Sequence, residues 1–196
     1  ILRDPDSGPV VIGGTAWLWS RPELAGALDV LFVDEAGQMS LADALAASEA
    51  AANLVLLGDP QQLDQPIQGS HPEGTAVSAL QHLLQEHKTM PPERGLFLEQ
   101  TWRLHPAICA FTSELFYEDR LTSRPGLEVQ AVVASQPFSG AGLWLFPVVH
   151  EGNQNSSAEE IETLTQLVEL LLQAQWRDDR GVTHPLRLDD ILIVCP

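Results

Sequence analysis

The chain has 196 residues, of which 44% are hydrophobic, so it can bury one substantial core or two smaller ones. It contains no run approaching the roughly 20 apolar residues of a membrane span and no signal-peptide pattern at its start, which predicts a soluble, cytoplasmic protein without membrane contact. The formal net charge of −17 argues against a broad nucleic-acid-binding surface, although backbone amides, hydroxyls and a few arginines can still hold a strand locally.

Short runs that are apolar throughout indicate strands buried on both faces. They lie at residues 10–12, 30–33, 54–57, 143–146 and 191–194. Helical patterns separate them, with Ser40 and Thr75 as candidate N-caps of two short helices. We therefore expect a largely parallel α/β fold, in which ligands gather at the carboxyl ends of the strands.

The strand predicted at residues 30–33 ends in two adjacent carboxylates, Asp34 and Glu35, within DVLFVDEAGQ. This is a Walker B arrangement, because one carboxylate can orient magnesium while the other activates the water that attacks a terminal phosphate. An acidic turn at a strand end is the common explanation for an isolated Asp-Glu pair. The motifs that follow favour the catalytic interpretation.

The next predicted strand ends in the turn GDPQQL, residues 58–63, and a helix between the two strands indicates a βαβ unit. Gln61 and Gln62 are uncharged, so either can hydrogen-bond both a phosphate oxygen and an attacking water without repelling them. An ordinary polar turn is the alternative. The polar segment 87–95, HKTMPPERG, is the candidate link between two α/β units, residues 1–93 and 94–196.

The second unit opens with FLEQTWRLHPAI, residues 97–108. An arginine delivered from a neighbouring lobe can stabilise charge on a transferring phosphoryl group, which makes Arg103 the residue of interest. Trp102 could stack on a nucleotide base. A salt-bridged surface arginine and a core tryptophan are the alternatives.

Further helices are predicted in this unit. One starts at His105 with Pro106 in its first turn. The other starts at Ser157, forms a capping box with Glu160 and is expected to reach Trp176. The stretch 123–142 is rich in turn residues and predicts an irregular loop.

In this order, DEAGQ, GDPQQL and TWRLHP resemble motifs II, III and IV of superfamily 1B helicases, the group that contains the nonsense-mediated-decay and Okazaki-flap-processing helicases. GTAWLW, residues 14–19, is similar to the nucleic-acid-contacting motif Ic, and ILIVCP, residues 191–196, to the strand that enters motif IVa. GSHPEG and PPERG look like the helicase half of bacterial proteins that carry a fused RecB-like nuclease. The resemblance implies parts of two RecA-like domains of the P-loop NTPase type.

The resemblance also implies cofactors and partners. ATP and Mg²⁺ would be the cofactors, and single-stranded nucleic acid, DNA in preference to RNA, would be the partner, with movement from 5′ to 3′. Asp34 would coordinate the magnesium, Glu35 would be the catalytic base, and Gln62 would sense the terminal phosphate in preference to Gln61. Gln38 would couple ATP hydrolysis to nucleic-acid binding. Gly14 and Thr15 would contact the phosphates of the nucleic-acid strand.

For the second unit the resemblance implies that Arg103 is an arginine finger and that Trp102 stands where the family often places a base-stacking tyrosine. Thr101 departs from the usual glutamine, which leaves the hydrogen-bonding role of that position open. The following His105 and Pro106 match the pattern.

A Walker A loop, GxxxxGK[ST], is absent from the sequence, since Gly13 and Gly14 are followed by Thr and Ala. We therefore expect the chain alone to bind ATP very weakly and to be a section of a longer motor, ending before motifs V and VI. Two other functions stay open: a catalytically silent acidic module that docks a protein partner, and a magnesium phosphohydrolase that uses Asp34 and Asp59. Neither the histidines nor Cys109 and Cys195 have the spacing of a metal site.

Overall fold

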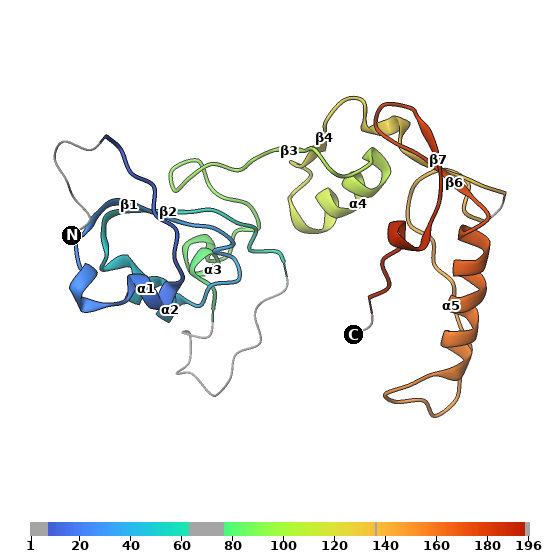
Figure 1. Ribbon diagram of the computed structural model, residues 1–196, viewed down its shortest axis with the longest axis horizontal. Coiled ribbons are helices and arrows are strands. Elements are labelled where there is room, and N and C mark those ends of the chain that lie inside the picture. The colour runs from blue at the N-terminus through green and yellow to red at the C-terminus, as the bar shows by residue number, and fades with distance from the viewer. Residues whose placement is uncertain (1–7, 63–76, 136, 195–196) are drawn as a thin grey trace. The chain divides into compact units, whose positions relative to one another are not determined.

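The computed structural model describes residues 8–62, 77–135 and 137–194 (Figure 1). The chain divides into two compact units, Ile1–Phe97 and Leu98–Pro196, which we call the N-terminal and C-terminal units. The division falls after Phe97 instead of after residue 93, the boundary expected from the sequence. The segment 87–95 belongs to the N-terminal unit because the Arg94 guanidinium donates to the carbonyl of Leu83 at 2.6 Å.

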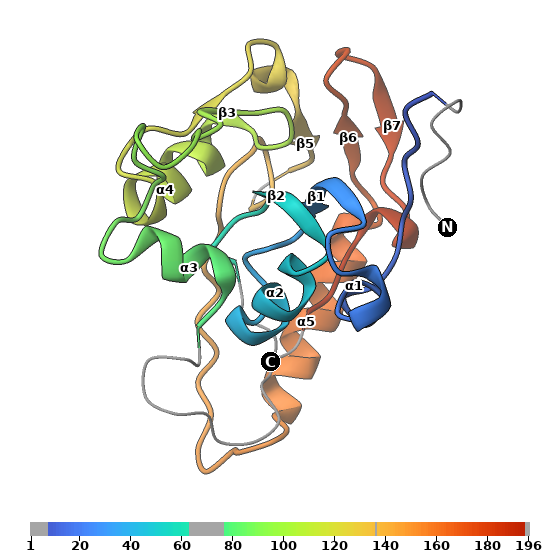
Figure 2. The same ribbon diagram turned by 90° about the vertical axis from the view of Figure 1, so that its left-hand side faces the viewer.

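The N-terminal unit is built around one parallel strand pair. Its elements are α1 (Ala16–Trp19), the 3-10 helix η1 (Pro22–Leu24), β1 (Leu28–Val33), α2 (Leu41–Ser48), β2 (Ala51–Leu56) and α3 (Ala79–Leu84). β1 and β2 run in parallel, with Leu28 opposite Ala51 and Val33 opposite Leu56, and α2 connects them. The βαβ unit predicted from the sequence is therefore confirmed. α1 and α2 lie side by side next to this sheet (Figure 2).

Serine side chains start the two helices that follow the strands. The Ser40 hydroxyl accepts the N–H of Asp43 at 3.1 Å, as predicted, and satisfies one of the unpaired amides of the first turn of α2. The corresponding cap of α3 is Ser78. Thr75, the cap expected for this helix, lies outside the described residues.

The core of the N-terminal unit covers one face of β1. Leu31 and Val33 are buried, whereas Val30 and Phe32 are exposed, because successive side chains of a strand point to opposite faces. The expectation that this strand is buried on both faces is therefore wrong for the described residues. The buried core consists of Trp19, Leu31, Val33, Ala36, Ala47, Ala50 and Leu80.

The C-terminal unit combines a short parallel pair with an antiparallel sheet. Its elements are β3 (Gln100–Thr101), α4 (Pro106–Phe116), β4 (Thr122–Ser123), the 3-10 helix η2 (Leu127–Val129), β5 (Ala131–Val133), α5 (Ala158–Leu171), β6 (Gln175–Arg177), β7 (Thr183–Pro185) and the 3-10 helix η3 (Leu188–Asp190). β3 and β4 are parallel, and the order β5-β6-β7 is antiparallel. The largely parallel arrangement expected for the whole chain thus holds for the N-terminal unit and for β3–β4.

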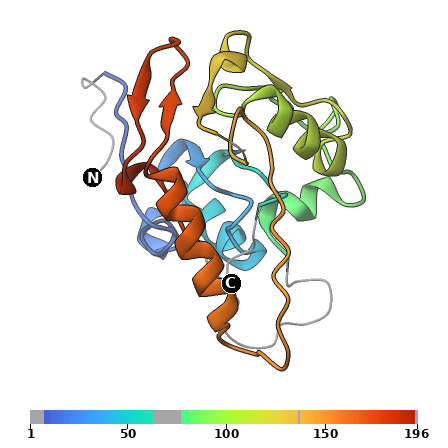
Figure 3. The same ribbon diagram turned by 90° about the vertical axis from the view of Figure 1, so that its right-hand side faces the viewer.

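The helix that begins after Ser157 is shorter than its periodicity indicates. The Ser157 hydroxyl accepts the N–H of Glu160 at 3.2 Å, which confirms the N-cap, and it donates to Glu159. The return bond from the Glu160 side chain that would complete the expected capping box does not form within the described residues. α5 ends at Leu171, and Trp176 lies in β6, opposite Val132. Pairing with strands on both sides overrides the helical pattern at this point, and Figure 3 shows α5 leading into the β6–β7 hairpin.

Three of the predicted strands do not form. Residues 10–12, 143–146 and 191–194 have no strand structure in the described chain. An apolar run becomes a strand only where a neighbouring segment supplies backbone partners, and these runs have none in the ladders described. By contrast, α4 begins as predicted, with the His105 ring accepting the N–H of Ala107 at 3.1 Å.

None of the helices described combines the length and hydrophobicity needed to cross a membrane. The longest of them, α5, has 14 residues.

Candidate functional site

The first candidate element is the turn after β1, which carries both predicted carboxylates at the surface. Asp34 and Glu35 are exposed, and Glu35 adopts φ 52°, a left-handed conformation that is uncommon outside glycine. The Asp34 carboxylate accepts the N–H of Glu35 at 3.0 Å, and the Glu35 carbonyl accepts the N–H of Gln38 at 2.9 Å. These bonds hold a sharp turn in a backbone conformation that is typical of functional sites.

The second candidate element is the turn after β2, which Asp59 organises. Its carboxylate accepts the N–H of Gln61 at 3.0 Å and is 3.5 Å from the amide nitrogen of Gln62. The Gln61 side chain donates to the Lys88 carbonyl at 3.1 Å, so it anchors the turn to a distant segment. Gln62 is exposed, which leaves it better placed than Gln61 to meet a ligand.

These two turns are packed backbone against backbone. Ala36 donates to the Leu57 carbonyl at 2.8 Å, continuing the ladder of β1 and β2 into the turns. A Cβ atom on Gly37 would lie 2.3 Å from the Asp59 carbonyl oxygen, and one on Gly58, which has φ 151°, would lie 2.9 Å from the Ala36 nitrogen. Only glycine allows this approach. The carboxylate turn and the glutamine turn are therefore held side by side at the carboxyl ends of two paired strands.

Gly37→Ala tests this packing. We expect the substitution to lower the free energy of unfolding of the 196-residue chain by about 2 kcal/mol, because a methyl group at 2.3 Å from a carbonyl oxygen forces the two turns apart. Urea unfolding followed by tryptophan fluorescence measures the change. Gly13→Ala is the matched control, since a Cβ there meets nothing within 4 Å, and its effect should stay within about 0.5 kcal/mol. Equal stability of the two variants would contradict the packing argument.

A cavity of about 420 Å³ lies beside the carboxylate turn. Asp34, Glu35, Gln38 and Gly14 line it together, so the structure brings these four predicted residues to one place. The Gly14 carbonyl accepts the indole N–H of Trp19 at 3.2 Å, which fixes this wall of the cavity. The remaining predicted residues of the unit, Thr15, Gln61 and Gln62, do not line the cavity.

In the C-terminal unit, Thr101 shapes the turn that presents Trp102 and Arg103. Its hydroxyl accepts the N–H groups of Arg103 at 3.2 Å and Leu104 at 3.4 Å, and the Leu104 carbonyl in turn accepts the hydroxyl of Ser123. A threonine hydroxyl that organises the following residues is a recurrent turn device. The hydrogen-bonding role left open for Thr101 is therefore a local one in this structure.

Both predicted functional side chains of this turn face outward. Trp102 is 70% exposed, which excludes a core role. The Arg103 guanidinium makes no ion pair within the described part of the chain, in contrast to Arg120 and Arg124, which pair with Glu99 and Asp179. Within the described residues, Arg103 therefore has no salt bridge and Trp102 is not a core residue.

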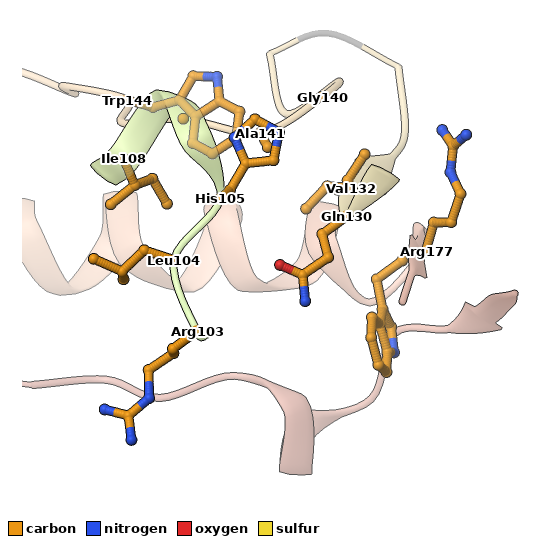
Figure 4. A pocket seen from close by; sticks show the side chains of 13 residues that line it. Arg103, Leu104, His105, Ile108, Gln130, Val132, Gly140, Ala141, Trp144 and Arg177 are labelled. Atoms are coloured by element: carbon orange, nitrogen blue, oxygen red, sulfur yellow. The ribbon is translucent and has the colours of Figure 1, made fainter. Parts of the chain in front are cut away.

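Arg103 also lines a second cavity, of about 290 Å³, within the C-terminal unit. His105, Trp144, Trp176 and Arg177 contribute to the same cavity, and Trp102 does not. Figure 4 shows the Arg103 side chain extending away from Trp144. The Arg103 side chain is therefore exposed and directed away from the indole of Trp144.

The described residues favour neither a multi-ligand metal site nor a reactive cysteine. Across residues 8–62, 77–135 and 137–194, no group of three or more His, Cys, Asp or Glu side chains could hold a metal ion. Cys109 is buried, and this burial raises the pKa of its thiol, which disfavours the reactive thiolate. Cys195 lies outside the described residues.

Two residues that shape the candidate elements were not anticipated from the sequence. Gly37 is needed for the contact between the turns, and Arg124 lies over the Trp102 ring with its Cζ atom 4.7 Å from the ring centroid. A glycine within a carboxylate turn was a signal that could have been noticed. The position of Arg124 had no sequence signal, because it depends on the register of β3 and β4.

Residues 75–196 match the family described as AAA domain. The chain belongs to this AAA domain family. Among curated proteins it is similar to the 5′-3′ DNA helicase ZGRF1 of Mus musculus, with 33% identity over 48% of the chain. It is also similar to the DNA replication ATP-dependent helicase/nuclease JHS1 of Arabidopsis thaliana, with 28% identity over 81%, and to the helicase SEN1 of Saccharomyces cerevisiae, with 23% over 74%.

The chain spans 5% of the length of ZGRF1, 11% of JHS1 and 7% of SEN1. No solved structure matches it significantly. The family and the relatives identify the chain as a superfamily 1 helicase-like segment, and they agree with the α/β, RecA-like fold class expected from its motifs.

Proposed function

We propose that this AAA domain chain is the part of an ATP-dependent helicase that hydrolyses the nucleotide. The observation that carries this proposal is the contact between the carboxylate turn and the glutamine turn at the ends of β1 and β2, where Gly37 and Gly58 allow the two backbones to touch. A water activated by a carboxylate and a terminal phosphate sensed by an amide must lie close together, which this contact permits.

In this proposal Glu35 is the general base and Gln62 senses the terminal phosphate. Gln38 shares the cavity of Glu35 and would couple hydrolysis to strand binding. Gln61 is assigned an anchoring role, since its amide donates to the Lys88 carbonyl. Arg103 and Trp102 of the C-terminal unit would act as the arginine finger and the base-stacking ring. The N-terminal and C-terminal units would then belong to two RecA-like lobes.

Magnesium fits the carboxylate turn. Mg²⁺ is commonly held by one or two carboxylates together with substrate phosphates and water, so a site with few protein ligands is sufficient. Asp34 is exposed and lines the cavity, and its ligand atom would be a carboxylate oxygen. When bound, the ion would neutralise charge on the phosphates. Asp59 is a poorer candidate ligand, since it does not line this cavity.

Single-stranded DNA is the nucleic acid that we propose as partner, with Gly14 and Thr15 contacting its phosphates. The relative ZGRF1 is named a 5′-3′ DNA helicase, which favours DNA and that direction of movement. JHS1 is named a helicase/nuclease, which agrees with a RecB-like nuclease in the same protein. The net charge of −17 requires that the strand contacts be few and local.

The experiment is an ATPase assay on the full-length protein that contains this chain. We expect single-stranded DNA to stimulate hydrolysis in the presence of magnesium, with single-stranded RNA as the parallel arm. Stimulation by RNA and not by DNA would identify RNA as the nucleic-acid substrate. The absence of hydrolysis with either strand would reject the helicase assignment.

The acidic charge favours one second candidate, a catalytically silent module that docks a protein partner. The two candidates differ in whether the full-length protein must contain a Walker A loop. A silent module needs no Walker A loop, whereas a motor requires one for the β- and γ-phosphates. A Walker A loop elsewhere in the full-length protein would therefore favour the motor, and its absence there would favour the silent module.

A further inference from the structure

One face of the exposed Trp102 ring is occupied by an arginine from a different strand. The Arg124 guanidinium carbon lies 4.7 Å from the ring centroid, within the range of about 6 Å for a cation–π interaction. No aromatic ring contacts Trp102 in the part of the chain that the structure describes. A ring that is 70% exposed and covered on one face by a cation is a stacking surface with a fixed orientation.

The sheet register places Arg124 beside Trp102. β3 and β4 are parallel with Thr101 opposite Ser123, so the next residue of each strand, Trp102 and Arg124, leaves the sheet at the same level. The Arg124 N–H donates to the Thr101 carbonyl at 2.9 Å and extends this pairing by one residue. The arginine backbone is therefore tied directly to the residue that precedes the tryptophan.

The Arg124 side chain is held in place from its other end. Its guanidinium donates to the Asp179 carboxylate at 3.2 Å, and its Nε atom is buried without a hydrogen-bond partner in the described structure. Asp179 belongs to the tight turn between β6 and β7, in which the Asp178 carboxylate accepts the N–H groups of Arg180 at 2.9 Å and Val182 at 2.8 Å. The chain of contacts thus runs from a rigid turn through Arg124 to the ring.

We propose that Arg124 is a positioning residue that holds the Trp102 indole ready to stack on the nucleobase of ATP, with Asp179 orienting the guanidinium. The inference rests on the proposed nucleotide-binding role of Trp102. It identifies Arg124 as the residue that orders the Trp102 indole before the nucleotide binds. A side chain that is already ordered does not lose its conformational freedom on binding, and this saving strengthens the complex.

The expected signature is a change in KM and not in kcat. The base lies away from the reacting phosphorus, so its contact contributes equally to the ground state and the transition state. In strand-stimulated ATPase assays on the full-length protein, Trp102→Ala should raise KM for ATP by about tenfold. Arg124→Met, which keeps the length of the side chain and removes the cation, should raise it by about threefold to tenfold.

A double-mutant cycle shows whether Arg124 acts through the ring. We expect Trp102→Ala combined with Arg124→Met to raise KM no further than Trp102→Ala alone, because the arginine has nothing left to orient. Arg124→Lys retains a cation near the ring and should return KM toward the wild-type value. Asp179→Asn removes the charge that pairs with the Arg124 guanidinium. It should therefore raise KM for ATP, as Arg124→Met does.

Arg120→Met is the matched control. Arg120 pairs with Glu99 at 2.9 Å, and its side chain is 34% exposed, against 31% for Arg124, so both variants remove a similar surface ion pair. The control should leave KM unchanged. An unchanged KM in Arg124→Met, or effects of Arg124→Met and Trp102→Ala that add fully, would overturn the inference. If Trp102→Ala itself has no effect on KM, the inference also falls, while the hydrolytic assignment is judged separately from Glu35→Gln.

Discussion

Glu35→Gln in the full-length protein should reduce the kcat of strand-stimulated ATP hydrolysis by about 100-fold to 10,000-fold while nucleotide affinity is retained. The amide keeps the shape of the side chain and loses the ability to accept a proton from water. Asp34 is unchanged by this substitution, so the magnesium ligand and the hydrogen bond from the Glu35 N–H to its carboxylate are expected to persist. Steady-state kinetics combined with equilibrium binding of ATP measure the two quantities.

Glu23→Gln provides the control for Glu35→Gln. Glu23 is an exposed glutamate of the same unit, in the 3-10 helix η1, and it does not line the cavity that contains Glu35. We expect its substitution to leave kcat unchanged. Turnover of Glu35→Gln close to that of the wild type would remove Glu35 as the base and direct attention to another carboxylate.

Arg103→Ala should reduce kcat by about 1,000-fold, the lower end of the effect of an arginine finger, and change nucleotide affinity much less. The guanidinium is exposed and makes no ion pair in the described residues, so its loss does not leave a buried charge unpaired. Arg103→Lys should recover only part of the rate, because an ammonium cannot reproduce the planar, bidentate contact of a guanidinium with phosphate oxygens.

Arg177→Ala controls for the loss of a cation from the same region. Arg177 is exposed and lines the same cavity as Arg103, but it follows no motif of the helicase family. We expect its kcat to stay within about twofold of the wild type, as is common for surface substitutions. Equal loss of rate in the two variants would show that the total positive charge matters and not an arginine at position 103.

The starts of α2, α4 and α5 and the order of the two main strands could be predicted from the sequence because they depend on short-range chemistry. Ser40 bonds to an amide three residues later, and His105 to an amide two residues later, so each cap is encoded within one turn of chain. The carboxylate pair at the end of β1 and the glutamine turn after β2 were predicted in the same way. Two apolar runs separated by a helical segment are sufficient to indicate a parallel pair.

Prediction from the pattern was wrong where distant segments decide the backbone conformation. Trp176 continues an apolar helical periodicity, yet it lies in β6 because β5 and β7 pair with it from both sides. Residues 191–194 are as apolar as β1 and have no strand partner in the described chain. A strand is defined by its neighbours, and the sequence of one segment does not contain them.

The sequence by itself determined which residue types stand at the end of each strand and the start of each helix, because hydrogen bonds over two to four residues are local. Only the tertiary structure decided that Gly37 touches the carbonyl of Asp59 and that Arg124, anchored by Asp179 at a separation of 55 residues, covers one face of Trp102. The reason is that such contacts depend on sheet register and on turns meeting in space. These distances are set by the whole fold of each unit and not by any one segment.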